Sequence, residues 1–396
     1  MRVVITHTDF RIYWPARLNA LTAYLNNKRI EFEIVEIAGA GSPYAFSGSL
    51  ASYPANWHCL FPNKRMEDIS PFDANIALRR KLNELQPDII FAGAIAFPSG
   101  ATAIRYAIEH KKKVIIFDDA RLEDVPRSWL VDFIKKKIYS CVNAILCPSE
   151  AWYPTFKYFG FKRSQIFYGL NVVDNSFWNE QNFIGPNNSA SGYILTVGRQ
   201  IPKKNFLLLL NAYQNYTSKS VTPKELVLVG NGPEHELLVD FVEKNRLNTV
   251  KFLPFKSQDE LKNLFQKAYY FVLPSRHGET WGLVVNEAMA TGLPVVVSNQ
   301  VGCASTLVKE GVNGYTFSPN NVNELADLLV KMDTLGAIKR REMGEKSKEI
   351  INEWGLDRFC QGAYDAIQFV SGSTAKNPGM VTRLILKIWK GRYRPV

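Results

Sequence analysis

Short runs rich in β-branched residues alternate with longer helical segments along most of this chain. Segments with helical spacing, such as 17–27 and 100–112, separate the runs. The runs that we interpret as strands are 2–6, 32–37, 88–93, 113–118 and 144–149, followed by 193–198, 225–230, 250–255, 269–275, 294–299 and 314–319. This alternation predicts βαβ units and parallel sheets that are buried on both faces.

The alternation is interrupted between residues 168 and 190, where the chain is rich in Gly, Asn, Ser and Pro. We interpret this stretch as a connection between two domains. The fold class that we predict is α/β, with two Rossmann-like, doubly wound parallel-sheet domains facing across a cleft. We place them at 1–172 and 173–375, with the last helix a candidate to cross back to the first domain, and a basic amphipathic tail at 376–396. Ligands of such sheets bind at the carboxyl ends of the strands, so the cleft is the expected active site.

The formal net charge of +11 indicates an anionic partner, but charge alone does not choose among nucleic acid, a phosphate-bearing substrate and lipid head groups. No basic and aromatic recognition motif accompanies it, so we predict no nucleic acid partner. The five cysteines are widely spaced, without a CxxC pair or a cluster with histidine. We therefore expect no metal site, no disulfide framework and a cytoplasmic location. Nowhere do 18 apolar residues run uninterrupted.

Cations follow the strand at 193–198, in the segment VGRQIPKKN. Arg199 comes directly after the strand, and Lys203 and Lys204 precede a helical run that Asn205 is expected to cap. Positive side chains beside a helix N-terminus are typical of a phosphate site. A solvated basic loop is the alternative, and the position at a strand end favours phosphate binding.

The segment LVGNGPEHE follows another strand, and Gly230 and Gly232 allow a tight turn there. Position 235 is His, so the dinucleotide fingerprint G-x-G-x-x-G is absent, which argues against a nicotinamide or flavin cofactor. Whether this turn contacts a ligand stays open at the level of sequence.

Two glutamates stand in the segment HGETWGLVVNEAMATG. Glu279 lies on a loop, and Glu287 lies in a helix that is apolar on most faces, where a carboxylate is unfavourable unless it is paired or hydrogen-bonded. A ribose diol would supply two donors. The alternatives are a solvated Glu279 and a Glu287 that points to solvent beside Asn286.

The order of the segments VGRQIPKKN, LVGNGPE, VKFLPF, PSRHGETWGLVVNEAMATGLPVVVSN and EGVNGYTF resembles the C-terminal half of the retaining GT-B glycosyltransferases of family four. The resemblance is strong over 190–320 and looser over 80–190. It implies transfer of a hexose, with retention of anomeric configuration and without a metal or cofactor. The implied donor is a UDP- or GDP-sugar, and the implied acceptor is a hydroxyl of a glycan or a lipid-linked acceptor, in cell-surface polysaccharide or lipopolysaccharide assembly.

The resemblance also implies roles for individual residues. Arg199 and Lys204 match the pair that binds the diphosphate, and Glu279 matches the glutamate that contacts hydroxyls of the transferred sugar. These three are the catalytic candidates. Glu287 matches the glutamate that binds the ribose. The other donor-binding candidates are Gly198, Lys203, Phe255, Lys256, Thr280, Trp281, Gly282 and Leu283.

The N-terminal half departs from the family pattern. The segment THTDFRIYWPARL stands where a glycine-rich loop is expected, and the histidine often found after the fourth strand is absent. The acceptor-side candidates are therefore His7, Asp9, Asp118 and Asp119. The last two could orient an acceptor hydroxyl or cap the segment that follows them.

The C-terminal segment VTRLILKIWKGRYRPV has apolar residues at helical spacing, at positions 381, 384, 385, 388 and 389, together with five basic residues and no acid. Segment 127–140 has a similar mixture. Both patterns are typical of a basic amphipathic helix at a membrane interface, so we predict peripheral contact with an anionic membrane at the inner face of the cell membrane. The alternative is a helix that packs on the N-terminal domain with a solvated basic edge.

Two other function classes would account for parts of this sequence. A sugar-nucleotide epimerase of similar architecture would bind the same donor, and a non-enzymatic nucleic acid binder would account for the net charge. The paired glutamates favour glycosyl transfer over both.

Overall fold

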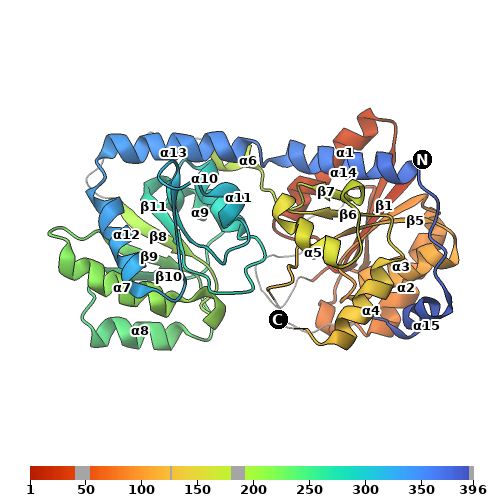
Figure 1. The fold of residues 1–396 in the computed structure, drawn as a ribbon, viewed down its shortest axis with the longest axis horizontal. Helices are drawn as coiled ribbons and strands as arrows, with labels where there is room; N and C mark the ends of the chain where they lie inside the picture. Colours follow the sequence, from red (N-terminus) through yellow and green to blue (C-terminus); the bar gives the residue numbers. More distant parts are fainter. Residues whose placement is uncertain (41–53, 125–126, 180–191, 392–396) are drawn as a thin grey trace. The chain divides into compact units, whose positions relative to one another are not determined.

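The chain forms two compact units, shown in Figure 1. The structure, a computed structural model, describes residues 1–40, 54–124, 127–179 and 192–391. Unit 1 comprises Met1–Val172 together with Leu356–Val396, and unit 2 comprises Val173–Gly355. The chain therefore returns to unit 1 after unit 2 is complete. Residues 180–190 of the predicted connection and 392–396 of the predicted tail lie outside the described residues.

Unit 1 contains a seven-stranded parallel sheet in the order β3-β2-β1-β4-β5-β6-β7. Its strands are β1 (Arg2–His7), β2 (Glu31–Ala38), β3 (Trp57–Phe61), β4 (Ile89–Ala92), β5 (Lys113–Phe117), β6 (Ala144–Cys147) and β7 (Ile166–Tyr168). The edge strands β3 and β7 were not predicted, because WHCLF and IFY are short and nearly lack β-branched residues. The order of the strands reverses between β1 and β4, which is the topological switch point of a doubly wound sheet.

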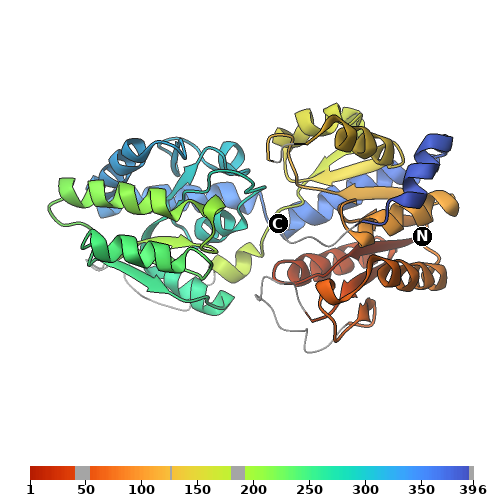
Figure 2. The same ribbon diagram turned by 90° about the horizontal axis from the view of Figure 1, so that it is seen from below.

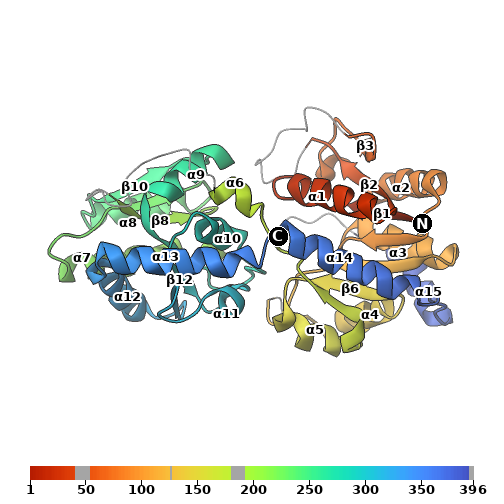
Figure 3. The ribbon, with the colours of Figure 1, turned by 90° about the horizontal axis from the view of Figure 1, so that it is seen from above.

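Helices cover both faces of the sheet of unit 1. Its helices are α1 (Trp14–Asn27), α2 (Pro71–Leu85), α3 (Pro98–Glu109), α4 (Trp129–Tyr139), α5 (Tyr153–Tyr158), α14 (Leu356–Ser371) and α15 (Met380–Ile388), with short 3-10 turns at Met66–Asp68, Glu150–Trp152 and Arg163–Gln165. Helices α1 and α14 contact each other on one face, and α2 and α3 lie on the other (Figures 1 and 3). One continuous core joins the sheet to α1 and α14, including Val3, Ile5, Leu21, Ala363 and Ile367.

Unit 2 contains a six-stranded parallel sheet in the order β10-β9-β8-β11-β12-β13. Its strands are β8 (Tyr193–Val197), β9 (Leu226–Val229), β10 (Val250–Leu253), β11 (Ala268–Leu273), β12 (Val295–Ser298) and β13 (Gly314–Phe317). All six were predicted from the sequence. The order reverses between β8 and β11, so the switch point of this sheet lies between these two neighbouring strands.

The helices of unit 2 also lie on both faces of its sheet. They are α6 (Asn175–Asn179), α7 (Phe206–Lys219), α8 (His235–Lys244), α9 (Gln258–Lys267), α10 (Leu283–Ala290), α11 (Ala304–Leu307), α12 (Val322–Thr334) and α13 (Ala337–Asn352), with a 3-10 turn at Pro202–Lys204. Helices α7, α8 and α12 share a core with the sheet, and α10 contacts α13 (Figure 1). The prediction of two Rossmann-like α/β domains is thus confirmed. In the described part of the chain, no helix has both the length and the apolar character needed to span a bilayer.

Candidate functional site

Two loops meet at the switch point of unit 2. One follows β8 and contains the 3-10 turn Pro202–Lys204, and the other follows β11 and leads to α10. Because β8 and β11 are neighbours in a parallel sheet, both loops leave the same edge. In open α/β sheets this edge, at the point of reversal, is where ligands bind.

A largely buried ion pair joins the two loops. The Nζ of Lys204 lies 2.5 Å from Oε2 of Glu279, and their side chains are only 12% and 15% exposed. The hydroxyl of Ser275 donates to the same carboxylate oxygen at 3.2 Å. The structure therefore brings together two of the three predicted catalytic residues, one from each loop.

The charge of Glu279 is set by this environment. Burial acts to raise the pKa of its carboxyl group, but the ammonium groups of Lys204 and Lys203 and the hydrogen bond from Ser275 outweigh burial, so the pKa is lowered below its ordinary value. At neutral pH Glu279 is a carboxylate, which can accept hydrogen bonds and cannot donate a proton.

Further hydrogen bonds hold the two loops together. Lys203 donates from Nζ to the carbonyl of Gly278 at 3.4 Å, and its own carbonyl accepts from the backbone N–H of Arg276 at 2.9 Å. The prediction that the side chain of Asn205 caps α7 is wrong. Its amide donates instead to the carbonyls of Pro274 and Pro319, at 3.1 and 2.9 Å, so it links the loops after β11 and β13.

The backbone is tightly packed where β8 ends. A Cβ on Gly198 would lie 3.2 Å from Cε of Lys204, and a Cβ on Gly230 would lie 2.1 Å from the carbonyl oxygen of Gly198. Gly230 has φ +130°, so both space and conformation require glycine there. Arg199 follows Gly198 directly and is half-buried. The predicted phosphate-binding residues therefore start from a closely fixed segment of backbone.

The second loop ends at Gly282, which has φ +93° and directly precedes α10. A Cβ there would lie 2.8 Å from Cγ1 of Val301. Leu283 is the first residue of α10 and is half-buried, as is Thr280. The backbone conformation that glycine permits thus directs the start of α10 toward the same sheet edge.

The helix α10 is buried around Glu287. Asn286 is fully buried and Glu287 is 2% exposed, so the interpretation of Glu287 as a residue on a solvated stripe is wrong. The buried Trp281 donates from Nε1 to Oδ1 of Asn286 at 2.9 Å and packs against Trp354, with ring centroids 5.5 Å apart. Trp281 therefore fixes the loop against the helix with its side chain.

Phe255 and Lys256 follow the edge strand β10. Phe255 is exposed, and Lys256 forms an ion pair with Glu260 of α9 at 2.9 Å. Glu260 also accepts from the backbone N–H of Ser257 and so caps α9. These two predicted donor-binding residues lie after a different strand from the Lys204–Glu279 pair.

The acceptor-side candidates belong to unit 1, and two of them lie at its switch point, where His7 is the last residue of β1 and Asp9 belongs to the loop that follows. The ring of His7 is surrounded by Phe10, Trp14 and Phe117, with centroids 5.4 to 5.7 Å away. Burial lowers the pKa of His7 to about 4, so the ring is neutral at pH 7. For Asp9, burial raises the pKa to about 6, with Arg11 acting in the opposite direction.

Asp118 and Asp119 follow β5 and have structural partners. Asp118 accepts hydrogen bonds from the hydroxyl of Tyr139 and from the backbone N–H of Ala120, and its Oδ2 lies 3.3 Å from Nζ of Lys135. Asp119 accepts from Nδ2 of Asn171 at 3.0 Å. Asp118 therefore anchors α4 and caps the loop after β5.

The titration of His7 leads to a prediction for stability. Its folded-state pKa is depressed from 6.5 to about 4, so the unfolded chain binds a proton more readily between these values. The stability that the neutral ring contributes is present above pH 6.5 and is lost as the pH falls through about 4. Between these limits the free energy of unfolding should fall by about 1 to 3 kcal/mol more in the wild type than in a His7→Gln variant. Urea unfolding across this pH range measures the difference, and parallel profiles for the two proteins would contradict it.

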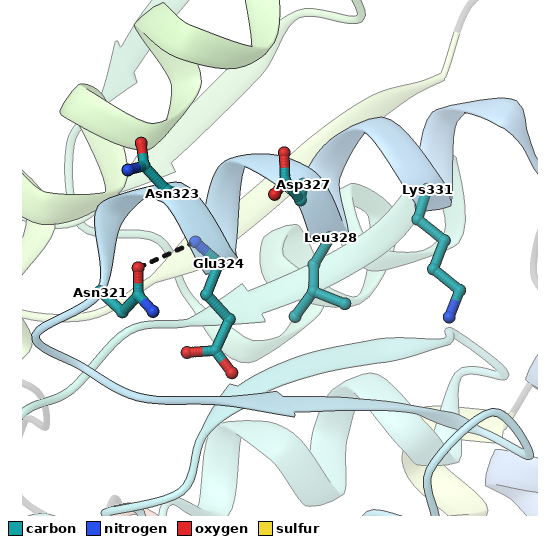
Figure 4. A pocket seen from close by; sticks show the side chains of 6 residues that line it. All are labelled: Asn321, Asn323, Glu324, Asp327, Leu328 and Lys331. Atoms are coloured by element: carbon teal, nitrogen blue, oxygen red, sulfur yellow. Dashed lines mark hydrogen bonds between the residues drawn. The ribbon is translucent and has the colours of Figure 1, made fainter.

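A pocket on the surface of α12 contains none of the predicted residues (Figure 4). It is lined by Asn321, Asn323, Glu324, Asp327, Leu328 and Lys331. Its polar groups serve the fold, because Asn321 caps α12 by accepting from the backbone N–H of Glu324 at 3.1 Å, and Asp327 pairs with Lys219 at 2.7 Å. Among the described residues, no group of three or more His, Cys, Asp or Glu side chains is arranged to hold a metal ion.

Two residues of the strand-end loops were missed at the level of sequence. Ser275, the last residue of the run FVLPS, donates to Glu279. Gln200 is buried, donates to the carbonyl of Gly230 at 2.7 Å and lies 2.7 Å from Nδ1 of His235. Ser275 ends the predicted strand 269–275 and Gln200 is the second residue after the predicted strand 193–198, and these positions are the signal that could have identified them.

Comparisons with known proteins agree with this geometry. The family model for glycosyl transferases group 1 matches residues 179–350. An uncharacterised glycosyltransferase from Haemophilus influenzae is 30% identical over 302 residues, which cover 73% of this chain and 79% of that protein. The O-antigen chain mannosyltransferase B of Escherichia coli is 34% identical over 137 residues, which cover 34% of this chain and 35% of that protein. The chain spans about half the length, or less, of several other curated relatives that it matches.

Solved structures share the fold. The structure of Anabaena HepE in complex with UDP-glucose aligns with a TM-score of 0.70 and 17% identity, covering 93% of this chain and 99% of that one. This likeness shows the GT-B fold, with two Rossmann-like domains in one chain. Because the relative from Haemophilus influenzae is 30% identical and is covered over 79% of its length, and the family model matches within unit 2, we conclude that the chain belongs to the glycosyl transferases group 1 and has the GT-B fold.

Proposed function

We propose that this protein is a retaining, metal-independent hexosyltransferase that uses a UDP- or GDP-sugar as donor. The observation that supports this best is the buried Lys204–Glu279 pair at the switch point of unit 2, beside Gly198 and Arg199. A cation and an anion thus lie together at one end of the sheet, and we assign the cation to phosphate and the anion to sugar hydroxyls. Retention of configuration and membership of family four rest on the sequence resemblance.

In this mechanism Arg199 and Lys204 bind the diphosphate. As the bond between sugar and phosphate breaks, negative charge develops on the leaving diphosphate, and fixed cations stabilise it. An ammonium group has three N–H donors, so Lys204 can donate to Glu279 and to phosphate oxygens at the same time. Two cations provide the charge that a metal ion provides in other transferases, which is why we propose that the reaction needs no metal.

Glu279 and Glu287 bind the two ends of the donor. Glu279 is ionised, so it accepts hydrogen bonds from the transferred sugar. Glu287 is buried in α10, and a ribose diol would donate two hydrogen bonds to its carboxylate. The backbone at Gly282, with Leu283 beside it, brings the start of α10 to the same edge. Lys203 and Thr280, two further candidates for donor binding, belong to the two loops at this edge of the sheet.

The acceptor that we propose is a hydroxyl of a glycan or of a lipid-linked glycan, in the assembly of cell-surface polysaccharide or lipopolysaccharide. The similarity to an O-antigen mannosyltransferase supports this class of acceptor. We place the protein in the cytoplasm, in contact with the inner face of the cell membrane. His7 and Asp9 remain the acceptor-side candidates, because they lie at the switch point of unit 1.

A screen of nucleotide sugars by thermal unfolding tests the donor. A ligand at about 100 times its Kd should stabilise the protein by about 2.7 kcal/mol. We expect one UDP- or GDP-sugar to raise the Tm of the wild type and to have a smaller effect on a Glu287→Gln variant. The same change at the exposed Glu342, Glu342→Gln, is the control and should leave the shift intact. No shift with any nucleotide sugar would contradict the proposal, and interconversion of sugar nucleotides without an acceptor would favour an epimerase.

A further inference from the structure

Two neighbouring helices of unit 1 expose large apolar side chains. Helices α4 and α15 contact each other, and α15, dark blue in Figure 2, also contacts α3. Trp129 is 79% exposed and Met380 is 86% exposed, and the others are more than two-fifths exposed. We call this the α4–α15 surface, and its residues are Trp129, Leu130, Val131 and Phe133 of α4 with Met380, Val381, Leu384 and Ile388 of α15. Large exposed apolar patches on a protein surface mark sites of interaction.

Helix α15 packs on unit 1 through a face that does not include its exposed apolar residues. Thr382 and Leu386 are buried, and Nε1 of Trp389 donates to the carbonyl of Ile95 at 2.7 Å. The sequence left open whether the helix packs on its domain or lies at a membrane. The structure shows that it packs on unit 1 through a narrow face, and the apolar stripe at Val381 and Leu384 is left outside.

Helix α4 is held in the same way. Its inner residues Lys135 and Tyr139 bind Asp118 at the end of β5, and Ile138 is buried. Its one acidic residue, Asp132, pairs with Arg127 at 3.3 Å. The outward apolar residues of α4 are therefore not needed to hold the helix in place.

The charges on these helices are positive. Lys136 and Lys387 are exposed, and neither helix has an acidic residue other than Asp132. A second copy of this surface would bring like charges together, and a nucleic acid would leave the apolar side chains without a partner. A bilayer with anionic lipids accommodates both, because the apolar side chains enter the boundary between head groups and acyl chains and the cations meet lipid phosphates.

We propose that the α4–α15 surface docks unit 1 on an anionic lipid bilayer. This proposal rests on the proposed function, because docking on a bilayer would give the enzyme access to a lipid-linked acceptor. Both helices are joined to loops at the carboxyl edge of the sheet, α4 through Asp118 after β5 and α15 through the carbonyl of Ile95 after β4. A docked surface would therefore hold this edge, with the acceptor-side candidates, near the head groups.

Co-sedimentation with vesicles tests the inference without any sugar nucleotide. The probes are vesicles of phosphatidylcholine alone and of phosphatidylcholine with phosphatidylglycerol in equal amounts. We expect the wild type to bind the anionic vesicles, and we expect Leu384→Ser with Ile388→Ser, or Lys136→Glu with Lys387→Glu, to weaken binding about tenfold or more. Added salt should weaken binding of the wild type, since the attraction is partly electrostatic.

The matched controls lie in unit 2. Val221→Ser with Ile338→Ser removes two exposed apolar side chains, and Lys244→Glu reverses an exposed charge, so these variants should bind like the wild type. Equal binding by the surface variants and the controls, or no binding by the wild type, would overturn the proposal. A wild-type dimer that becomes monomeric in the Leu384→Ser, Ile388→Ser variant, without vesicle binding, would assign the surface to a second copy instead. Transfer to a soluble acceptor is measured separately, so failure of the proposed function is distinguishable from failure of docking.

Discussion

Replacing Arg199 or Lys204 with alanine should lower turnover about a hundredfold or more. Each change removes a fixed cation from the place where charge develops on the leaving diphosphate, and loss of one oriented donor at a developing anion has an effect of this size. For Lys204 the structure adds a second consequence, because Glu279 would keep its buried carboxylate without the ammonium at 2.5 Å. We therefore expect Lys204→Ala to misplace Glu279 and to have the larger effect of the two.

Initial rates of transfer with saturating donor measure this effect. The control is Lys219→Ala, which removes a lysine from the end of α7 that pairs with Asp327 at the surface. Its turnover should equal that of the wild type. Thermal unfolding of each variant shows whether lost turnover reflects lost folding. Near-normal turnover in both alanine variants would contradict the assignment of the diphosphate site.

Replacing Arg11 with methionine should reduce the free energy of unfolding by about 3 to 5 kcal/mol, because it leaves a buried carboxylate without its cation. Nη1 of Arg11 lies 2.8 Å from Oε2 of Glu36, and their side chains are 4% and 0% exposed. Arg11 also donates to the carbonyl of Gly39 at 2.8 Å, and Glu36 accepts from the backbone N–H of Phe10 at 3.0 Å. The pair thus fixes the loop after β1, which contains the acceptor-side candidate Asp9.

Equilibrium unfolding in urea, monitored through the transition of unit 1, measures the decrease in the free energy of unfolding. The matched control is Arg163→Met, which breaks the pair with Glu150 at the surface, where the side chains are 60% and 65% exposed. Exposed ion pairs contribute less than about 1 kcal/mol, so this variant should unfold almost like the wild type. A similar loss in both variants would show that burial does not govern the strength of the Arg11–Glu36 pair.

The sequence was most informative about strands that are buried on both faces. Runs such as RVVIT and YILTV are continuous and β-branched, because a central parallel strand has helices on each side. The edge strands of unit 1 were missed because they are not buried in this way. In WHCLF four of the five residues are partly exposed, so these positions do not require apolar β-branched side chains.

Local pattern was a poorer guide to individual side chains of the site. It placed Lys204 and Glu279 on two loops, but only the reversal of strand order between β8 and β11 brings these loops together. It suggested that Asn205 caps the nearest helix, whereas its amide bonds to two carbonyls that are distant in sequence. Hydrogen bonds of this kind depend on which loops become neighbours, and the periodicity of the sequence does not show which loops these are.

By itself, the sequence determined that this protein has two parallel-sheet α/β domains and that cations and carboxylates follow the strands of the second. Periodicity and composition are properties of consecutive residues, and they suffice for elements and for the ends of elements. Tertiary structure alone decided which strand ends meet, that Glu287 is buried, and which face of α15 contacts unit 1. These outcomes depend on packing between segments far apart in the chain. A helix with apolar residues on more than one face can bury any of these faces, and the segments that pack against the helix decide which face is buried.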